Sequence, residues 1–264
     1  MPSTSSDPLS ARFAAWRSAQ HTALVPYLTA GYPTPDDTLD LMHRYARAGA
    51  DVIELGVPFS DPIADGPTIQ RASQRALEHG TTLPWALDQL RRFRDESDTA
   101  VVLFSYLNPL LNYGADHFVE AAVAAGADGL LVTDLPLGSD AALEEALASS
   151  SLSLVRLIAP TTEPKRAATI ARSAQGFIYY IARAGVTGAR AALPADLSAQ
   201  VTALRVLTPV PICVGFGIST ARQAAAVGRV ADGVVIGSAL IDAIDRDGLE
   251  GAEMLLRDMR QALG

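Results

Sequence analysis

The chain has 264 residues, of which 49% are apolar and 19% are charged, enough apolar mass for one large domain or two small ones. Its formal net charge of −8 at pH 7 argues against nucleic acid or an anionic membrane surface as a partner. The single cysteine, Cys213, excludes an internal disulfide and a two-cysteine metal motif. Its apolar neighbours predict a buried structural thiol.

The start of the chain and its apolar runs predict where the protein resides. Residues 1–8 are rich in Ser, Thr and Pro without an apolar stretch, which predicts a disordered tail and not a signal peptide. Apolar runs such as 233–236 are too short to cross a bilayer. With the sparse use of cysteine, these features predict a cytoplasmic protein.

From residue 23 onward, short β-branched runs alternate with helical patterns. The predicted strands are 23–28, 51–55, 100–104, 129–132, 152–158, 176–181, 212–214 and 233–236. The predicted helices are 35–48, 68–79, 83–94, 115–125, 139–148, 163–173, 195–207, 221–227 and the segment from 239 onward. Ser139 is expected to cap the helix that it opens.

Eight strand-then-helix units without a break in composition predict one α/β domain with a parallel sheet. The chain length fits a single (β/α)8 TIM barrel, here residues 9–264. An open doubly wound sheet is the alternative, but it usually has fewer strands. The phrases at 48–51, 125–128 and 230–233 each precede a strand and predict a repeated helix-to-strand turn containing an aspartate.

Catalytic groups of such a barrel lie where the strands end. Glu54 lies inside an apolar strand, where a carboxylate is costly unless it is paired or functional. The Pro- and Gly-rich loop after it carries Asp61, interpreted as a turn or interface residue, and Asp65, which could reach over a pocket. A core glutamate bonded to neighbouring backbone remains the alternative for Glu54.

Closely spaced glycines follow the last three strands, at 185–188, 215–217 and 237. Glycines let backbone N–H groups approach an anion, and the loops after strands seven and eight are the usual phosphate site of a barrel. No nucleotide-binding motif accompanies them. The histidines at 21, 43, 79 and 117 have no metal-ligand spacing. These features predict a cofactor-free enzyme with a phosphorylated substrate and carboxylate acid–base chemistry, without naming the reaction.

The segment 54–70, ELGVPFSDPIADGPTIQ, is similar to the signature of tryptophan synthase α subunits. PYLTAGYP at 26–33, GVTG at 185–188, GFGIS at 215–219 and GSAL at 237–240 follow in family order. The resemblance covers nearly the whole chain after the tail. It implies a lyase of tryptophan biosynthesis that cleaves indole-3-glycerol phosphate to indole and glyceraldehyde 3-phosphate. It also implies an α2β2 heterotetramer with a β subunit, to which pyridoxal phosphate would belong, and no cofactor in this chain.

The resemblance assigns roles residue by residue. Glu54 corresponds to the catalytic glutamate, a proton shuttle at indole C3 and the glycerol hydroxyl, and Asp65 to the catalytic aspartate facing ring N1. The implied substrate-binding residues are Tyr27, Phe104, Tyr179, Thr187, Gly188, Phe216, Gly217, Gly237 and Ser238. The implied β-subunit interface contains Pro58, Asp61 and Asn108.

Three positions depart from the family pattern, because Tyr27, Phe104 and Ala182 replace a common phenylalanine, leucine and serine. These changes leave the acid–base pair intact and affect the expected pocket shape. Three other functions compete: a stand-alone lyase that releases free indole for secondary metabolism, another phosphate-binding barrel such as an isomerase or aldolase, and a non-catalytic binding module. A Schiff-base aldolase needs a buried strand lysine, whereas the only lysine is Lys165 in a predicted helix. The retained carboxylate pair argues against a binding module.

Overall fold

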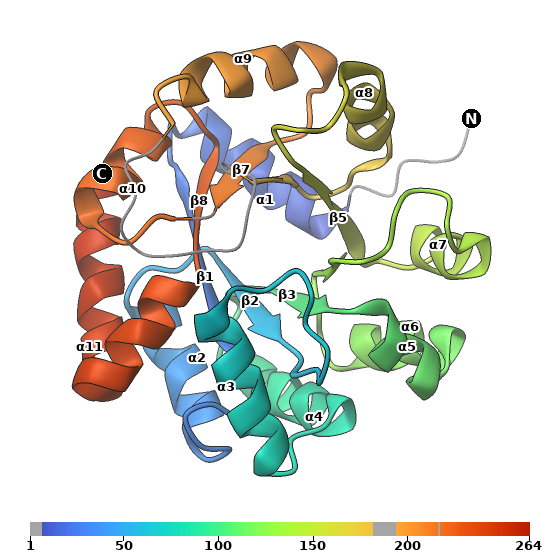
Figure 1. The fold of residues 1–264 in the computed structure, drawn as a ribbon, viewed down its shortest axis with the longest axis vertical. Coiled ribbons are helices and arrows are strands. Elements are labelled where there is room, and N and C mark those ends of the chain that lie inside the picture. The colour runs from blue at the N-terminus through green and yellow to red at the C-terminus, as the bar shows by residue number, and fades with distance from the viewer. Residues whose placement is uncertain (1–6, 182–193, 216) are drawn as a thin grey trace.

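The computed structural model describes residues 7–181, 194–215 and 217–264, and its centre is a closed barrel of eight parallel strands (Figure 1). Each strand pairs with the next along the chain, and the last pairs with the first. The strands are β1 Ala23–Thr29, β2 Val52–Gly56, β3 Ala100–Ser105, β4 Gly129–Val132, β5 Ser153–Ile158, β6 Ile178–Ile181, β7 Ile212–Gly215 and β8 Gly233–Ile236. The predicted (β/α)8 barrel is therefore confirmed.

Helices surround the barrel and cover its outer face (Figure 1). They are α1 Pro8–Ser18, α2 Asp37–Arg47, α3 Pro67–Glu78, α4 Leu83–Arg94, α5 Leu107–Tyr113, α6 Ala115–Ala124, α7 Ala141–Ala148, α8 Pro164–Ser173, α9 Leu197–Leu207, α10 Ala221–Gly228 and α11 Ser238–Leu263. The strands are buried along nearly their whole length because helices cover one face and barrel-interior side chains the other. Among the described residues, no helix combines the length and apolarity needed to cross a membrane.

The predicted tail of residues 1–8 needs a new boundary, because Asp7 caps helix α1 and Pro8 begins it. The Asp7 carboxylate caps α1 by accepting the N–H of Leu9 at 3.0 Å, and it also accepts the N–H of Gly176 at 2.8 Å. Phe13 of α1 is 1% exposed and packs with the interior side chains of the barrel. The helix escaped prediction because its apolar residues follow no clear helical period, while its Asp–Pro start was the available signal.

Two further local predictions need correction. Helix α5 was not predicted, because a seven-residue helix containing an internal proline gives little periodic signal. Helix α7 begins two residues later than predicted, and its cap is Asp140 instead of Ser139. The carboxylate of Asp140 accepts the N–H of Leu143 at 3.0 Å, which satisfies a donor of the first turn.

The repeated helix-to-strand turn is a real structural unit at the N-terminal end of the barrel. Asp51, Asp128 and Asp232 precede β2, β4 and β8, and each carboxylate accepts a backbone N–H of the preceding strand at 2.8 Å. The donors are Leu24, Val101 and Ile212, respectively. Each aspartate therefore fixes the start of one strand against its neighbour.

An arginine completes each of these three turns, which we call the Asp–Arg turns. Asp51 pairs with Arg260, Asp128 with Arg94 and Asp232 with Arg205. In the first two turns, Gly49 and Gly126 have φ values of +95° and +86°, and the stem of the paired arginine packs where a Cβ would lie. An ion pair and a backbone hydrogen bond thus recur in all three Asp–Arg turns, and a glycine with positive φ accompanies them in the first two.

Candidate active site

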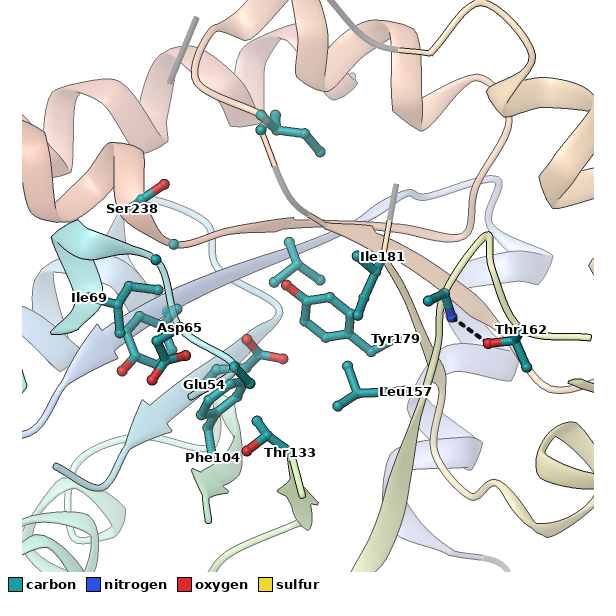
Figure 2. A pocket seen from close by; sticks show the side chains of 18 residues that line it. Glu54, Asp65, Ile69, Phe104, Thr133, Leu157, Thr162, Tyr179, Ile181 and Ser238 are labelled. Carbon is teal, nitrogen blue, oxygen red and sulfur yellow. Dashed lines mark hydrogen bonds between the residues drawn. The ribbon is translucent and has the colours of Figure 1, made fainter. Parts of the chain in front are cut away.

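A cavity of about 240 Å³ opens at the C-terminal ends of the strands (Figure 2). It is bounded by strand ends and by the loops that follow them. The lining residues are Tyr27, Glu54, Ala64, Asp65, Gly66, Ile69, Phe104, Thr133, Leu157, Ala159, Thr162, Tyr179, Ile181, Gly217, Ile218, Val235, Gly237 and Ser238. Most of them are apolar, so the few polar groups control orientation and chemistry.

Glu54 lies in the middle of β2, in register with Tyr27 of β1 and Val102 of β3. Its side chain points into the barrel mouth and is 1% exposed. One carboxylate oxygen, Oε1, is buried without a hydrogen-bond partner among the described residues. Burial without compensation disfavours the charged form and raises the pKa of Glu54 to about 8. The alternative of a core glutamate bonded to neighbouring backbone does not explain this unpartnered oxygen.

Asp65 belongs to the loop between β2 and α3 and is 6% exposed. Burial raises the pKa of Asp65 to about 6, and a hydrogen bond with Tyr106 opposes this shift. The same tyrosine hydroxyl accepts the N–H of Ala64 at 2.9 Å. The loop is also fastened to α3, because the N–H of Phe59 donates to the Ser73 hydroxyl at 2.8 Å. Asp65 is therefore held over the cavity in this structure.

The two carboxylates face the same cavity from two different elements (Figure 2). Their pKa values differ because Glu54 is the more deeply buried of the two and therefore has the higher pKa. Near pH 7, Glu54 is mostly protonated and Asp65 is mostly ionised. The cavity therefore offers one proton donor and one carboxylate acceptor at the same time.

Aromatic side chains form one wall of the cavity. The rings of Tyr27 and Phe104 meet edge to face, with centroids 5.3 Å apart. A Cβ at Gly56 would lie 2.2 Å from the Tyr27 hydroxyl, and a Cβ at Gly215 would lie 2.3 Å from the Tyr179 hydroxyl. Glycine at these strand ends makes room for the two tyrosines, and the wall suits a flat aromatic group.

The rim beside Tyr27 contains the described part of the predicted phosphate site, because a Cβ at Gly237 would lie 3.7 Å from the Tyr27 side chain. Gly217 has a φ of +81°, a conformation that favours glycine. Gly237 and Ser238 open α11, and no side chain of the described residues caps this helix start. Unoccupied N–H groups and the helix dipole make such a start favourable for an anion. The remaining predicted positions, Ala182, Thr187, Gly188 and Phe216, lie outside the described residues.

The three predicted interface residues do not line the cavity. Asp61 and Asn108 are exposed, whereas Pro58 is buried and offers a partner little surface of its own. Two apolar side chains on the same two segments, Ile63 and Leu111, are 78% and 46% exposed. The segments adjoin, because Tyr106 at the start of α5 bonds the loop after β2 and packs on its Phe59 ring, 5.1 Å away.

Several site residues were not identified from the sequence. Tyr106, Thr133, Leu157, Thr162 and Ile69 belong to the cavity wall or hold Asp65. Thr133 and Tyr106 directly follow the ends of β4 and β3, which is the signal that could have found them. A single polar residue after a strand is common in any loop, so this signal alone does not distinguish them.

The remaining titratable residues do not extend the site. Cys213 is fully buried among the interior side chains of the barrel, which confirms the predicted structural thiol. No group of three or more His, Cys, Asp or Glu side chains suited to a metal ion occurs in the described part of the chain. Lys165, the only lysine of the chain, is exposed on α8 and does not lie on a strand.

A closed parallel barrel with paired acid and base groups, an aromatic wall and an anion-favouring rim defines a TIM-barrel enzyme of the acid–base class. The family model for "Tryptophan synthase alpha chain" matches residues 13–262, and the chain belongs to this family. It functions as a tryptophan synthase alpha chain in tryptophan biosynthesis, which makes it a lyase. The predicted family, activity class and fold are confirmed.

The chain is similar to relatives and to solved structures along nearly its whole length. The alpha chain of Alkalilimnicola ehrlichii is 50% identical over 89% of this chain and 86% of its own length. That of Laribacter hongkongensis is 49% identical over 96% and 97%. Subunit alpha from Legionella pneumophila has a TM-score of 0.89 and 39% identity, covering 97% and 98% of the two chains. A Mycobacterium tuberculosis tryptophan synthase structure has a TM-score of 0.90 and 33% identity, covering 97% of each chain.

Proposed function

We propose that the chain cleaves indole-3-glycerol phosphate to indole and glyceraldehyde 3-phosphate, with Glu54 and Asp65 dividing the proton transfers. The observation that carries this proposal is the pair of buried carboxylates on one cavity, with pKa values of about 8 and about 6. Carbon–carbon cleavage beside an indole ring needs both a proton donor and a base at neutral pH. The family membership supports this reaction.

The reaction begins when protonated Glu54 donates its proton to indole C3, which interrupts the aromatic system and places positive charge on the ring nitrogen. The Asp65 carboxylate faces N1–H and stabilises that charge. Glu54, now ionised, accepts the proton of the hydroxyl on the adjacent carbon. The bond between this carbon and C3 breaks, its electron pair restores the indole ring, and the hydroxyl oxygen becomes the aldehyde carbonyl. Glu54 ends the cycle protonated.

The phosphate provides the third anchor. We infer that it lies at the start of α11, beside Gly237, Ser238 and Gly217, while the indole ring lies on the wall formed by Tyr27 and Phe104. Binding energy from a phosphate remote from the cleaved bond orients C3 toward Glu54. The side chains at Tyr27 and Phe104 are larger than the common ones, which implies a close fit around the ring.

The direct test is product analysis. Purified chain incubated with indole-3-glycerol phosphate should release indole and glyceraldehyde 3-phosphate in equal amounts, and the Glu54→Gln variant should serve as the control for contaminating enzymes. Release of neither product, or equal release by parent and variant, would overturn the proposed reaction.

We also propose that a tryptophan synthase β subunit binds this chain, giving an α2β2 assembly, over the face formed by Asp61, Ile63, Asn108 and Leu111. Exposed apolar side chains beside polar ones on adjoining segments support this choice. The solved Mycobacterium tuberculosis relative carries the name of the synthase. Leu111→Asp should reduce activation by a β subunit while leaving the basal rate unchanged, whereas Val206→Asp, at an 82% exposed site on α9, should change neither.

A stand-alone lyase would need no such activation, so measuring indole release with and without a β subunit separates the two functions. A cytoplasmic location also belongs to this proposal. It is supported by a biosynthetic role and by the single, buried, unpaired Cys213. Fluorescence of a tagged chain in its host cell tests the location.

A further inference from the structure

Helices α3 and α11 lie side by side, and both begin on the rim of the active-site cavity (Figure 1). The first residues of α3 directly follow Asp65, and Gly66 at its start lines the cavity. Helix α11 begins at Ser238, on the rim assigned to the phosphate. Any change in the spacing of these two helices therefore alters the distance between the ring-binding carboxylate and the anion rim.

Five side chains join the two helices and the loop after β1, and we call them the α3–α11 clamp. Arg71 of α3 pairs with Asp245 of α11 at 2.8 Å and approaches Asp242 at 3.9 Å. The Thr68 hydroxyl donates to Asp242 at 3.1 Å, and the Tyr32 hydroxyl donates to Asp245. Asp242 and Asp245 of α11 thus each have a partner on α3, and Asp245 has a second partner on the loop after β1.

The clamp lies within one or two helical turns of the two groups that it joins. Thr68 is three residues after Asp65, and Asp242 is four residues after Ser238, which is about one turn. Between clamp and cavity, the side chain of Ile69 lies 3.6 Å from the position that a Cβ of Gly237 would occupy. Figure 2 shows Ile69 between Asp65 and Ser238. A shift of α3 would therefore be transmitted directly to the anion rim.

The composition of the clamp points to positioning more than to stability. Arg71, Asp242 and Asp245 are 55%, 37% and 35% exposed, and ion pairs this accessible contribute little to folding. An ion pair with two further hydrogen bonds does restrict the relative movement of two helices. None of the clamp residues lines the cavity, so they do not contact the substrate.

We propose that the α3–α11 clamp is a positioning device, which holds the loop carrying Asp65 at the separation from the start of α11 that a phosphorylated indole substrate requires. This inference rests on the proposed function, because it assumes that the indole ring and the phosphate occupy the two ends of the cavity. Its principal residues are Arg71 and Asp245. They act through α3 and α11 and not on the reacting atoms.

The test uses the whole chain and compares one two-ended ligand with its separate parts. The probes are 3-(indol-3-yl)propyl phosphate, which lacks the hydroxyls needed for cleavage, together with indole alone and inorganic phosphate alone. The double variant Arg71→Ala/Asp245→Ala removes one cation and one anion, so the net charge near the phosphate is unchanged. The matched control, Asp88→Ala/Arg91→Ala, removes a similarly exposed pair, 2.8 Å apart, on α4.

We expect the clamp variant to bind the two-ended ligand about three- to tenfold more weakly, because its ends no longer meet both sites at once. Indole alone and phosphate alone should bind within about twofold of the parent, and the control should match the parent for all three probes. Turnover of indole-3-glycerol phosphate should fall by a similar factor, mainly in kcat/KM. Thr68→Val, which keeps the ion pair, should show a smaller loss of affinity for the two-ended ligand. This variant replaces the double variant in the test if the double variant fails to fold.

Unchanged affinity of the clamp variant for the two-ended ligand would overturn the inference. So would an equal loss with phosphate alone, which would indicate an electrostatic role, or an equal loss in the α4 control. Failure of the proposed function is distinct, since it appears in the parent chain as absence of indole release or of two-ended binding.

Discussion

At the N-terminal end of the barrel, Asp51, Asp128 and Asp232 each accept a backbone N–H and pair with an arginine. At the C-terminal end, Glu54 is more deeply buried, and one of its oxygens has no partner among the described residues. The same chemical group is thus hydrogen-bonded and ion-paired at one end, whereas burial raises the pKa of Glu54 at the other. We expect the first arrangement to support the fold and propose that the second supports the chemistry.

The contrast between the ends follows from which donors the surrounding elements supply. Each Asp–Arg turn places the carboxylate beside strand N–H groups and a helix-borne guanidinium, whereas Glu54 lies among apolar and aromatic side chains. Carboxylates of the first kind should matter for stability, and those of the second kind for turnover. Substitutions at the two ends separate these effects.

The largest effect on turnover should come from Glu54→Gln. Glutamine keeps the shape of the side chain but cannot donate and recover a proton, so indole release should fall by roughly 10²–10⁴-fold. Steady-state assays with indole-3-glycerol phosphate measure this change. Turnover at the parent rate would contradict the assigned role of Glu54.

The same variant should not lose stability at neutral pH. The pKa of Glu54 in the folded chain, about 8, lies above its unfolded value, so the folded state binds the extra proton. The contribution of this group to stability therefore declines as pH rises from about 4.5 to about 8. Glutamine has no such dependence. Relative to the parent, the free energy of unfolding of Glu54→Gln in urea should increase between pH 5 and pH 8.

The next largest effect on turnover should come from Asp65→Asn, with a decrease of roughly 10²-fold. The amide cannot stabilise positive charge on the ring nitrogen, although it can retain a hydrogen bond. Because the loop is held by Tyr106 and Ser73 as well, the melting temperature should change little. A large loss of stability without a decrease in turnover would contradict the catalytic role of Asp65 and indicate a structural role.

Asp128→Ala should show the opposite behaviour. It removes the acceptor of the Val101 N–H and the partner of a half-buried Arg94, so the free energy of unfolding should fall by about 2–4 kcal/mol. The KM and kcat of the folded fraction should match the parent, because Asp128 lies at the opposite end of the barrel. Asp88→Ala, at an exposed pair on α4, is the control and should cost less than about 0.5 kcal/mol.

The smallest effect should come from Tyr106→Phe. The variant loses the hydrogen bond that favours ionised Asp65, so the pKa of Asp65 should rise and the acidic limb of the rate profile should move upward. At pH 7 this predicts a decrease of only a few-fold. An acidic limb at the parent position would show that Tyr106 does not influence Asp65.

Much of this arrangement could be predicted from the sequence, because periodicity defines strands and strand ends define the site. The sequence indicates Glu54 as a candidate because a carboxylate inside an apolar strand is unusual. The repeated aspartate before a strand predicts a turn that the structure contains. The loop position of Asp65 and the glycines before α11 were also visible. In each case a local pattern carried the information.

What escaped prediction depends on contacts between distant segments. Helix α1 gains its place from Phe13 packing into the barrel and from Asp7 bonding Gly176, which no local pattern reveals. Tyr106 becomes a site residue only because the loop after β2 folds back onto it. The separation of the Glu54 and Asp65 pKa values likewise arises from tertiary burial.

The pH dependence of kcat for indole release tests the central claim most directly. Asp65 must be ionised and Glu54 protonated, so the rate should rise through about pH 6, fall through about pH 8 and peak between them. Asp65→Asn should remove the acidic limb from the residual activity. A profile with a single limb, or one in which the parent remains fully active well above pH 8, would contradict the assignment of Glu54 as the proton donor.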